Sequence, residues 1–497
     1  MSNAKKKITV IGLILMIFTE TFGFANTTVA YDQMGYASII WYILAAILFF
    51  LPSSMMFAEY GSALKNAKGG IYSWLKVSIG ERLAFIGTFI WLSAWIIWMV
   101  STASKVWIPL SSLIFGADKT QSWHFMGLSS IEVVGILAII WIILVTALAS
   151  NGVDKIAKVA SIGGTFVMIL SALFIVLSLV VWAANHGTMA QPIHAGSFIK
   201  SPNPLFQSPI ALISFVIYAI FAYGGMETMG GVVDSLEKPE RTFPLGIAIS
   251  MVVVMVLYSL MILLWGVSTN WHQVLGGKTV NLGNISYVLM NNLGVQIGNA
   301  LGTSHETAVM LGSILTRFTG LSMFLAYCGS FFVVIYSPIK SFILGSNPDL
   351  WPKRLTRINE HGMPSDAMRL QAIVICVIIF LVAFGGNAAQ RFYQILTNMA
   401  NVATTAPYLF LVGAFPAFKK RKDLKRPFVI YKNKVLTNII VAVVWLVIAF
   451  GIIFTCLSPI LQHDYQTAFW TIIGPLFFGG VAWIFYEVNT RHNRKQN

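Results

Sequence analysis

Two acidic residues lie inside long apolar segments, each beside glycine. Glu20 occurs in "FTETFGFAN", and Glu227 occurs in "YAIFAYGGMETMGGVVD". A carboxylate at membrane depth is costly, so it is by default a candidate for binding a substrate or a proton. Glycine inside a helix costs about 1 kcal/mol relative to alanine, and opened backbone in lipid is tolerated only where it is buried in protein or lines a cavity. The two segments therefore predict two interrupted helices that line a site.

The ends of an interrupted helix carry free backbone groups of opposite polarity. N–H groups at the start of a half-helix favour an anion such as a carboxylate. Carbonyl groups at the end of a half-helix favour a cation such as an ammonium group. A pair of interrupted helices thus suits a zwitterion such as an amino acid. Two alternatives stay open, because the glycines also suit close helix packing and Glu20 also suits a neutral, hydrogen-bonded core acid.

The elements that must position these residues are membrane helices. Of the 497 residues, 57% are hydrophobic and 10% are charged, against about 25% charged residues in an average soluble protein. Apolar runs of about 20 residues, the length that crosses a bilayer, recur along the whole chain. These runs predict an all-α integral membrane protein with about twelve spans, near 8–31, 38–62, 83–113, 131–149, 157–184, 209–233, 244–268, 307–337, 367–385, 392–417, 435–458 and 467–487.

The two interruptions fall in spans one and six. These spans hold corresponding positions if the first ten spans form two five-helix repeats, a pattern typical of transporters with a site at the membrane midplane. We therefore expect residues 1–497 to form a single polytopic membrane domain. Its first repeat would be 8–184, its second repeat 209–417, and its two extra helices would lie in 435–487.

The net charge of +15 predicts a membrane orientation rather than a nucleic-acid partner. Most of the 33 Lys and Arg residues lie in the two tails and in loops on one side of the predicted spans. "KKRKDLKR" at 419–426 is the strongest cluster. Loops rich in Lys and Arg stay in the cytoplasm, so both termini are expected to be cytoplasmic. The exceptions are Lys105, Lys119, Lys200, Lys278, Arg317 and Arg391.

Motifs of other protein classes fail on their spacing. "GGKTV" at 276–280 lacks the first glycine of a phosphate-binding loop, because His272 holds that position. The eight His and three Cys residues show no metal-ligand spacing, and no nucleophile elbow occurs. The sequence thus predicts no enzyme activity, no cofactor and no metal site.

Three stretches resemble the amino acid–polyamine–organocation permeases, with the glutamate/γ-aminobutyrate antiporters as the nearest branch. They are "KGGIYSWLKVSIGERLAFIGTFIWL", "FAYGGMETMGGVVDSLEKPERTFPLGI" and "LWPKRLTRINEHGMPSDAM". The resemblance covers nearly the whole chain and implies a leucine-transporter-like fold, with spans 1–5 and 6–10 as inverted repeats and two extra helices. It implies a secondary active transporter of amino acids or related amines in a bacterial inner membrane, working as an exchanger or as a proton-coupled symporter. A sensor of the same fold that has lost transport is the alternative.

The resemblance also assigns residues to a substrate site. The amides of the span-one interruption would meet the substrate carboxylate, and the carbonyls of the span-six interruption would meet its amine. Glu227 matches the family glutamate and, with Glu20, is a candidate for proton coupling. Phe22 departs from the Gly-Ser-Gly of many relatives, and Val167 stands where some proton-coupled relatives have a lysine. The predicted substrate-binding residues are Thr21, Phe22, Gly23, Phe221, Ala222, Tyr223, Gly224 and Gly225.

Overall fold

The computed structural model describes residues 7–276, 280, 283–386, 402–403 and 405–494. Within these residues the regular structure is helical, and strand pairing is limited to two isolated β-bridges. The helices are α1 Val10–Thr21, α2 Phe24–Met34, α3 Ala37–Ala45, α4 Leu51–Ala63, α5 Gly70–Ile79, α6 Glu81–Ala103, α7 Trp107–Phe115, α8 Ser130–Ala149, α9 Val153–Ala184, α10 Pro209–Phe221, α11 Pro239–Ser268, α12 Trp271–Val274, α13 Ile285–Ala300, α14 His305–Val334, α15 Ser337–Ile343, α16 Ser365–Phe384, α18 Ala406–Lys420, α19 Lys434–Leu461 and α20 Tyr465–Arg494. A π-helix, η1 Ala46–Phe50, joins α3 to α4, and a 3₁₀ helix, η4 Met226–Ser235, follows α10; shorter 3₁₀ turns are η2 Thr120–Ser122, η3 Pro204–Phe206 and η5 Pro348–Leu350.

Eleven helical segments of the described chain are long and apolar enough to cross a membrane. They correspond to predicted spans one to nine, eleven and twelve, which confirms the all-α membrane fold. The tenth predicted span, 392–417, lies partly outside the described residues, and its second half belongs to α18. The segments are Val10–Met34, Ala37–Ala63, Glu81–Phe115, Ser130–Ala149, Val153–Ala184, Pro209–Ser235, Pro239–Ser268, His305–Ile343, Ser365–Phe384, Lys434–Leu461 and Tyr465–Thr490.

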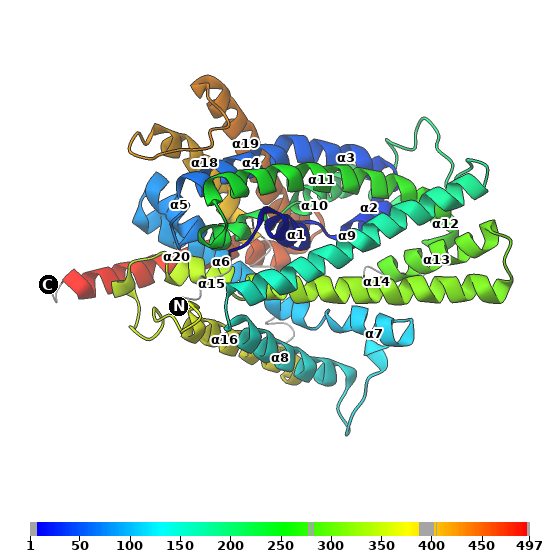
Figure 1. Cartoon of the computed structure of the whole chain (residues 1–497), viewed down its shortest axis with the longest axis horizontal. Coiled ribbons are helices and arrows are strands. Elements are labelled where there is room, and N and C mark those ends of the chain that lie inside the picture. Colours follow the sequence, from blue (N-terminus) through cyan, green and yellow to red (C-terminus); the bar gives the residue numbers. More distant parts are fainter. Residues whose placement is uncertain (1–6, 277–279, 281–282, 387–401, 404, 495–497) are drawn as a thin grey trace.

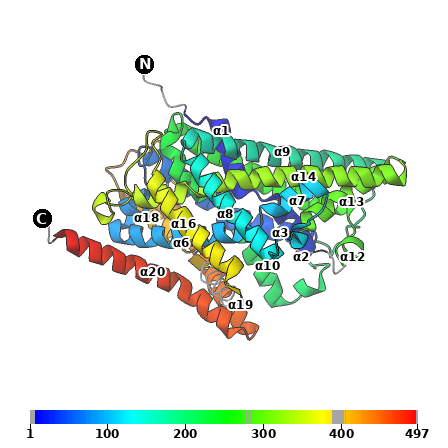
Figure 2. The ribbon, with the colours of Figure 1, turned by 90° about the horizontal axis from the view of Figure 1, so that it is seen from below.

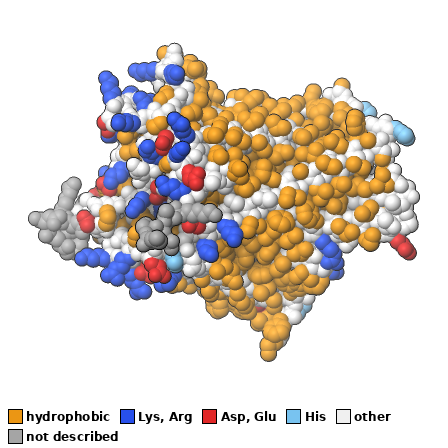
Figure 3. Space-filling model, in the orientation of Figure 1, with side chains coloured by type: hydrophobic (Ala, Val, Ile, Leu, Met, Phe, Trp, Pro, Cys, Tyr) orange, Lys and Arg blue, Asp and Glu red, His pale blue; other side chains and the backbone are white. Residues whose placement is uncertain are grey.

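The long helices run roughly along the longest axis of the molecule (Figure 1). α1 packs against α9 and α11, and most of its second half is buried. α9 and α14 lie side by side in both ribbon views (Figures 1 and 2). The start of α1 and the end of α20 lie at the same end of the molecule. Lys and Arg side chains gather at this end, which we call the basic end, and hydrophobic side chains cover the middle of the visible face (Figure 3). This distribution is what a bilayer requires of a spanning protein.

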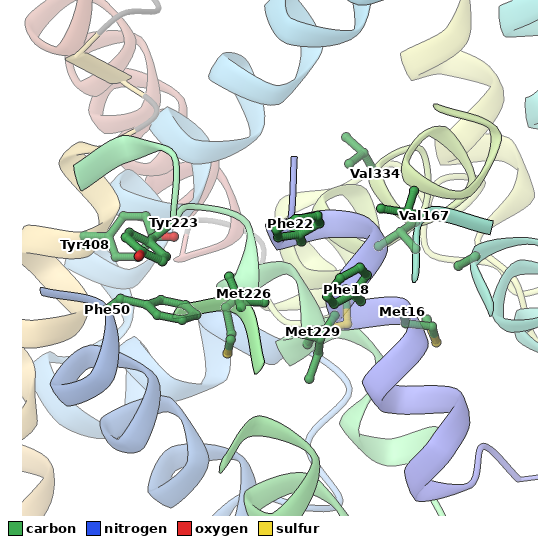
Figure 4. Close-up of a cluster of buried hydrophobic side chains, with 14 of the residues drawn as sticks. Met16, Phe18, Phe22, Phe50, Val167, Tyr223, Met226, Met229, Val334 and Tyr408 are labelled. Atoms are coloured by element: carbon green, nitrogen blue, oxygen red, sulfur yellow. The ribbon is translucent and has the colours of Figure 1, made fainter. Parts of the chain in front are cut away.

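Aromatic side chains fill the interior around the first and sixth spans (Figure 4). Phe18 and Phe22 stack with their ring centroids 4.6 Å apart, and Phe50 stacks on Tyr223 at the same distance. Phe50 comes from the π-helix in span two, and π-turns within helices frequently occur at functional sites. The interior is therefore packed by rings that come from several spans.

The loop between spans seven and eight contains a helix that packs inside the protein. Residues of this loop form α13, which is 16 residues long and packs against α14. Its apolar side chains Leu289, Met290 and Leu293 are fully buried. The small residues Gly294 and Gly312 lie at the contact, where a Cβ on Gly294 would approach the Gly312 backbone to 2.6 Å. Close glycine packing thus lets α13 lie directly against α14.

Candidate functional site

Span one is interrupted at the residues that the sequence singled out. α1 ends at Thr21, Phe22 and Gly23 have extended backbone with φ of −91° and −94°, and α2 begins at Phe24. The Phe22 side chain is 3% exposed. Its ring packs between Phe18 and Tyr258, with centroid distances of 4.6 and 4.9 Å. The bulky Phe22 fits this interruption because its side chain packs in the hydrophobic core.

Span six is interrupted between α10 and η4. α10 ends at Phe221, and the chain resumes a helical path at Met226 as a ten-residue 3₁₀ helix, whereas runs longer than three or four residues are uncommon. Gly225 has φ of +111°, and a Cβ there would lie 2.7 Å from the carbonyl oxygen of Glu20. Glycine satisfies both the left-handed backbone and this close approach. The two interruptions therefore touch each other at Glu20 and Gly225.

Tyr258, on α11, joins the two interruptions through one hydroxyl group. Its oxygen accepts the Gly23 N–H at 3.0 Å and the Asn26 amide at 3.2 Å. The same hydroxyl has two carbonyl acceptors within reach, Ala222 at 3.0 Å and Thr21 at 3.2 Å. The Tyr258 side chain is fully buried. Two backbone groups expected to receive the substrate, the Gly23 amide and the Ala222 carbonyl, thus have a protein partner in this structure.

Glu227 lies just beyond the span-six interruption and has several partners inside the protein. The Trp91 indole donates to one carboxyl oxygen at 3.3 Å, and the Gly225 N–H donates to the other at 3.0 Å. The Tyr408 hydroxyl donates to that second oxygen as well. Glu227 is 2% exposed, so these donors replace its water. The carboxyl group joins α6, η4 and α18.

A cavity of about 470 Å³ lies between the interruptions, a volume within the range of small-molecule sites. Nine predicted site residues line it: Glu20, Thr21, Phe22, Gly23, Phe221, Ala222, Gly224, Gly225 and Glu227. Tyr223 is not on the wall. Its hydroxyl donates to the Tyr42 carbonyl at 3.2 Å, and its ring stacks on Phe50. The structure therefore brings together most of the predicted residues and places Tyr223 behind them.

Aromatic rings make up much of the cavity wall. Trp95 and Trp98 line the cavity, whereas Trp91 is buried against Glu227. The aromatic lining residues are Phe22, Phe24, Phe49, Trp95, Trp98, Tyr218, Phe221, Tyr327 and Tyr408.

The span-one side of the cavity carries two buried polar atoms that lack a hydrogen-bond partner among the described residues. They are Oε1 of Glu20 and Oγ1 of Thr21. Buried polar atoms are nearly always paired in proteins, so an unpaired one needs an explanation. Val167, at the position where some proton-coupled relatives have a lysine, also lines the cavity and is 2% exposed. The wall around Glu20 is therefore apolar at that position.

A buried ion pair joins the far part of span six to span eight, toward the basic end. Lys340 of α15 lies 2.7 Å from an Asp234 carboxyl oxygen and donates to the Gly231 carbonyl at 2.8 Å. The Ser337 hydroxyl donates to the Thr228 carbonyl one turn away. Lys340 is 3% exposed. These contacts hold η4 against α15 on the side of the cavity that leads to the basic end.

A second buried carboxyl group fastens the basic segment that follows α18. Both oxygens of Glu59, at the end of span two, lie 2.9 Å from the Lys419 ammonium group. Arg426 is 3.6 Å away, and the Ile430 N–H donates to the carboxyl group at 3.1 Å. Glu59 is fully buried. Within "KKRKDLKR", Lys419 and Arg426 therefore make structural contacts with Glu59. The segment thus has a structural role in addition to its predicted role in membrane orientation.

The two basic residues predicted within spans three and eight lie outside the cavity wall. Arg317 donates to the Leu113 carbonyl at 2.9 Å and contacts the Ile114 carbonyl, so it caps the C-terminal end of α7. Lys105 lies in the turn between α6 and α7. In the described part of the chain, no group of three or more His, Cys, Asp or Glu residues could hold a metal ion.

Comparison with known proteins agrees with this geometry. The family model described as "Amino acid permease" matches residues 8–478. The chain is 51% identical over 488 residues to proteins named "Inner membrane transporter YjeM" from Salmonella typhimurium and Escherichia coli, covering 98% of this chain and 97% of theirs. It is 22% identical to a "Glutamate/gamma-aminobutyrate antiporter" of Lactococcus lactis, over 99% of this chain and 92% of that protein. The chain, a multi-pass membrane protein, belongs to the amino acid permease family.

Proposed function

We propose that this protein is a secondary active transporter that moves amino acids or related amines across the bacterial inner membrane by alternating access. The observation that carries the proposal is the cavity of about 470 Å³ between two interrupted spans. Irregular backbone at membrane depth is tolerated only where it is buried or lines a cavity, and such pairs of broken helices form the substrate sites of transporters. Relatives named for inner-membrane transport and for glutamate/γ-aminobutyrate exchange support the same class.

In this proposal the two unwound segments form the wall against which the substrate binds. The predicted contacts are Thr21 to Gly23 and Phe221 to Gly225, with Tyr223 supporting the wall from behind. Binding at both segments favours an occluded state, because a ligand shifts an equilibrium by its difference in affinity for the two states. The transporter works as an exchanger or as a proton symporter, with Glu227 and Glu20 as the candidate proton carriers.

Purified protein in liposomes tests the transport proposal. A counterflow screen over the common amino acids and amines should find at least one compound whose labelled form accumulates against an unlabelled internal pool. Gly225→Val provides the inactive control, because its side chain would strain the backbone and collide with the Glu20 carbonyl. Binding of a screened compound without counterflow or net uptake would instead identify a sensor of the same fold.

A separate experiment addresses the proposed proton role. Glu227→Gln keeps the shape of the side chain but removes its titration. We expect lower uptake and a flatter dependence of uptake on pH. Uptake and pH dependence equal to those of the parent protein would rule out Glu227 as the proton carrier.

The proposed orientation places both termini and the basic end in the cytoplasm. Asp423 lies in the exposed part of the basic segment, so Asp423→Cys offers a site for a membrane-impermeant thiol reagent. The reagent should label inside-out vesicles and spare intact spheroplasts. Labelling of intact spheroplasts alone would reverse the orientation.

A further inference from the structure

The Asp, Glu, Lys, Arg and His side chains that line the cavity are all carboxylic acids. Among its described lining residues, the side chains that carry a formal charge are Glu20 and Glu227, and none is Lys, Arg or His. In their ionised form, two carboxyl groups in one low-dielectric cavity attract a cation and repel an anion. The charge of the wall therefore bears on which substrates can enter.

The two carboxyl groups differ in their capacity to accept a further hydrogen bond. Both oxygens of Glu227 are engaged by Trp91, Gly225 and Tyr408. Oε1 of Glu20 is buried and has no hydrogen-bond partner among the described residues. A buried acceptor left without a donor costs about 1–3 kcal/mol, and more when it is charged. Glu20 is thus the cavity carboxyl group that can still accept a hydrogen bond from a ligand.

Three donors on this wall that could bind a substrate carboxylate are engaged, whereas the Thr21 hydroxyl has no partner among the described residues. The Gly23 N–H and the Asn26 side-chain amide both donate to Tyr258. The Gly225 N–H donates to Glu227 and to the Tyr408 hydroxyl. A carboxylate entering here would have to displace these partners while facing two acidic side chains. At Oε1 of Glu20, an ammonium group would displace no donor of the described residues, although Ser330 lies close to the same carboxyl group.

The remaining wall also suits a cation. Trp95 and Trp98 line the cavity with their rings 5.3 Å apart. The faces of Trp, Tyr and Phe rings attract ammonium groups, most strongly where water is excluded. The aromatic wall thus adds to the attraction of the carboxyl groups without adding a charge.

We propose that Glu20 binds the ammonium group of a substrate with a net positive charge. The substrate class is an organic ammonium ion, either an amine without a carboxylate or a cationic amino acid, and acidic amino acids are rejected. This inference rests on the proposed transport function and narrows it. It assigns Glu20 to substrate recognition, in addition to its candidacy for proton coupling.

A length-matched ligand series tests the charge preference on the whole protein in nanodiscs. The probes are 1,4-diaminobutane, n-butylamine, 4-aminobutyrate and glutamate, whose net charges at pH 7 run from positive to negative. Binding is measured by calorimetry and by the fluorescence of the cavity tryptophans. We expect the two amines to bind at least about tenfold more tightly than 4-aminobutyrate, which corresponds to about 1.4 kcal/mol, and glutamate to bind least. Equal or tighter binding of glutamate, or no binding of any probe, would overturn the inference.

Substitution of Glu20 tests the residue itself. Glu20→Gln should weaken binding of 1,4-diaminobutane by about 30-fold or more, the lower end for removing one partner of a buried charge pair, while 4-aminobutyrate changes less. Glu20→Asp should restore part of the preference. The exposed Glu306, in the first turn of α14, supplies the matched control, since Glu306→Gln should bind as the parent protein does. An unchanged ratio of affinities in Glu20→Gln would overturn the assignment.

The transport assay separates this inference from the proposed function. Counterflow of glutamate but not of the amines would overturn the charge preference and leave transport in place. Tight amine binding without flux of any compound would overturn transport and leave the ammonium site in place.

Discussion

The hydroxyl of Tyr258 lies 3.0 Å from the amide nitrogen of Gly23, although 235 residues separate them in the chain. The same oxygen lies 3.0 Å from the Ala222 carbonyl. One side chain of span seven therefore fixes the distance between the open backbone of span one and that of span six. It also satisfies buried groups that would otherwise be costly in a membrane protein.

Tyr258→Phe should destabilise the protein by about 1–3 kcal/mol, since it leaves the Gly23 N–H without its buried acceptor. The midpoint of thermal unfolding in detergent measures this loss. Tyr465, which is 64% exposed, provides the control, because Tyr465→Phe should leave the midpoint unchanged. If the two variants unfold alike, the Tyr258 hydroxyl does not stabilise the interruptions.

Glu227 and Tyr408 should behave as a coupled pair. The Tyr408 hydroxyl contacts both the Glu227 carboxyl group and the Gly225 N–H, so removing either partner disturbs the same network. We expect Glu227→Gln and Tyr408→Phe to show a coupling energy of about 0.5–3 kcal/mol in a double-mutant cycle of unfolding free energies. Additive effects would mean that the two side chains act independently.

Lys340→Met should be among the most destabilising changes outside the cavity. It leaves Asp234 without its partner at 2.7 Å, and breaking a buried ion pair costs about 3–5 kcal/mol. Unfolding by heat or denaturant measures the loss, and Lys340→Met combined with Asp234→Leu should recover most of it.

The matched control for Lys340 is Lys76→Met. Lys76 forms an exposed pair with Glu81 at 3.2 Å, and exposed pairs contribute about 0–1 kcal/mol. A loss for Lys76→Met as large as that for Lys340→Met would show that burial of the pair is not what matters.

Glu59→Gln should loosen the basic segment that follows α18. The substitution removes the charge that holds Lys419 and Arg426 and weakens the acceptor for the Ile430 N–H. Trypsin should then cut the segment 419–426 about tenfold faster, which corresponds to about 1.4 kcal/mol in the opening equilibrium when opening is fast relative to cleavage.

Asp423→Asn is the control for the cleavage experiment. The hydrogen bond from Arg421 lowers the pKa of Asp423 to about 2. The contribution of the ionised Asp423 to stability is therefore present above the ordinary carboxyl pKa. It is lost only as the pH falls through about 2. Asp423 stays ionised under trypsin assay conditions, but its pair with Arg421 is exposed. A similar acceleration in Asp423→Asn would show that any lost charge, rather than the Glu59 contact, loosens the segment.

The interruptions were predictable from sequence because the signal is local. Gly224, Gly225 and Glu227 lie close together in one apolar run. Together they would destabilise a continuous membrane helix, so they predict an interruption. Hydropathy likewise placed the eleven described spans within a few residues of their observed bounds. The position of Phe22 was harder to interpret, because its fit depends on the ring of Tyr258 from another span.

The partners of the site were not predictable in the same way. Tyr408 is 181 residues from Glu227 in sequence, and its hydroxyl gives no periodic signal. A tyrosine in an apolar span does need a buried partner for its hydroxyl group. That requirement could have marked Tyr258 and Tyr408 as candidates, but only the packing of helices identifies which groups they contact.

Because η4 is a 3₁₀ helix, this half of span six is longer than an α-helix of the same residues would be. Thr228, Gly231 and Asp234 repeat every three residues, so they share one face, and all three contact Ser337 or Lys340 of α15. A 3₁₀ helix rises about 2.0 Å per residue and an α-helix about 1.5 Å. Rewinding the ten residues of η4 as an α-helix would shorten the segment by about 5 Å and turn Asp234 by about 120° relative to Thr228. The ion pair with Lys340 is thus compatible with one winding of the segment and not with the other.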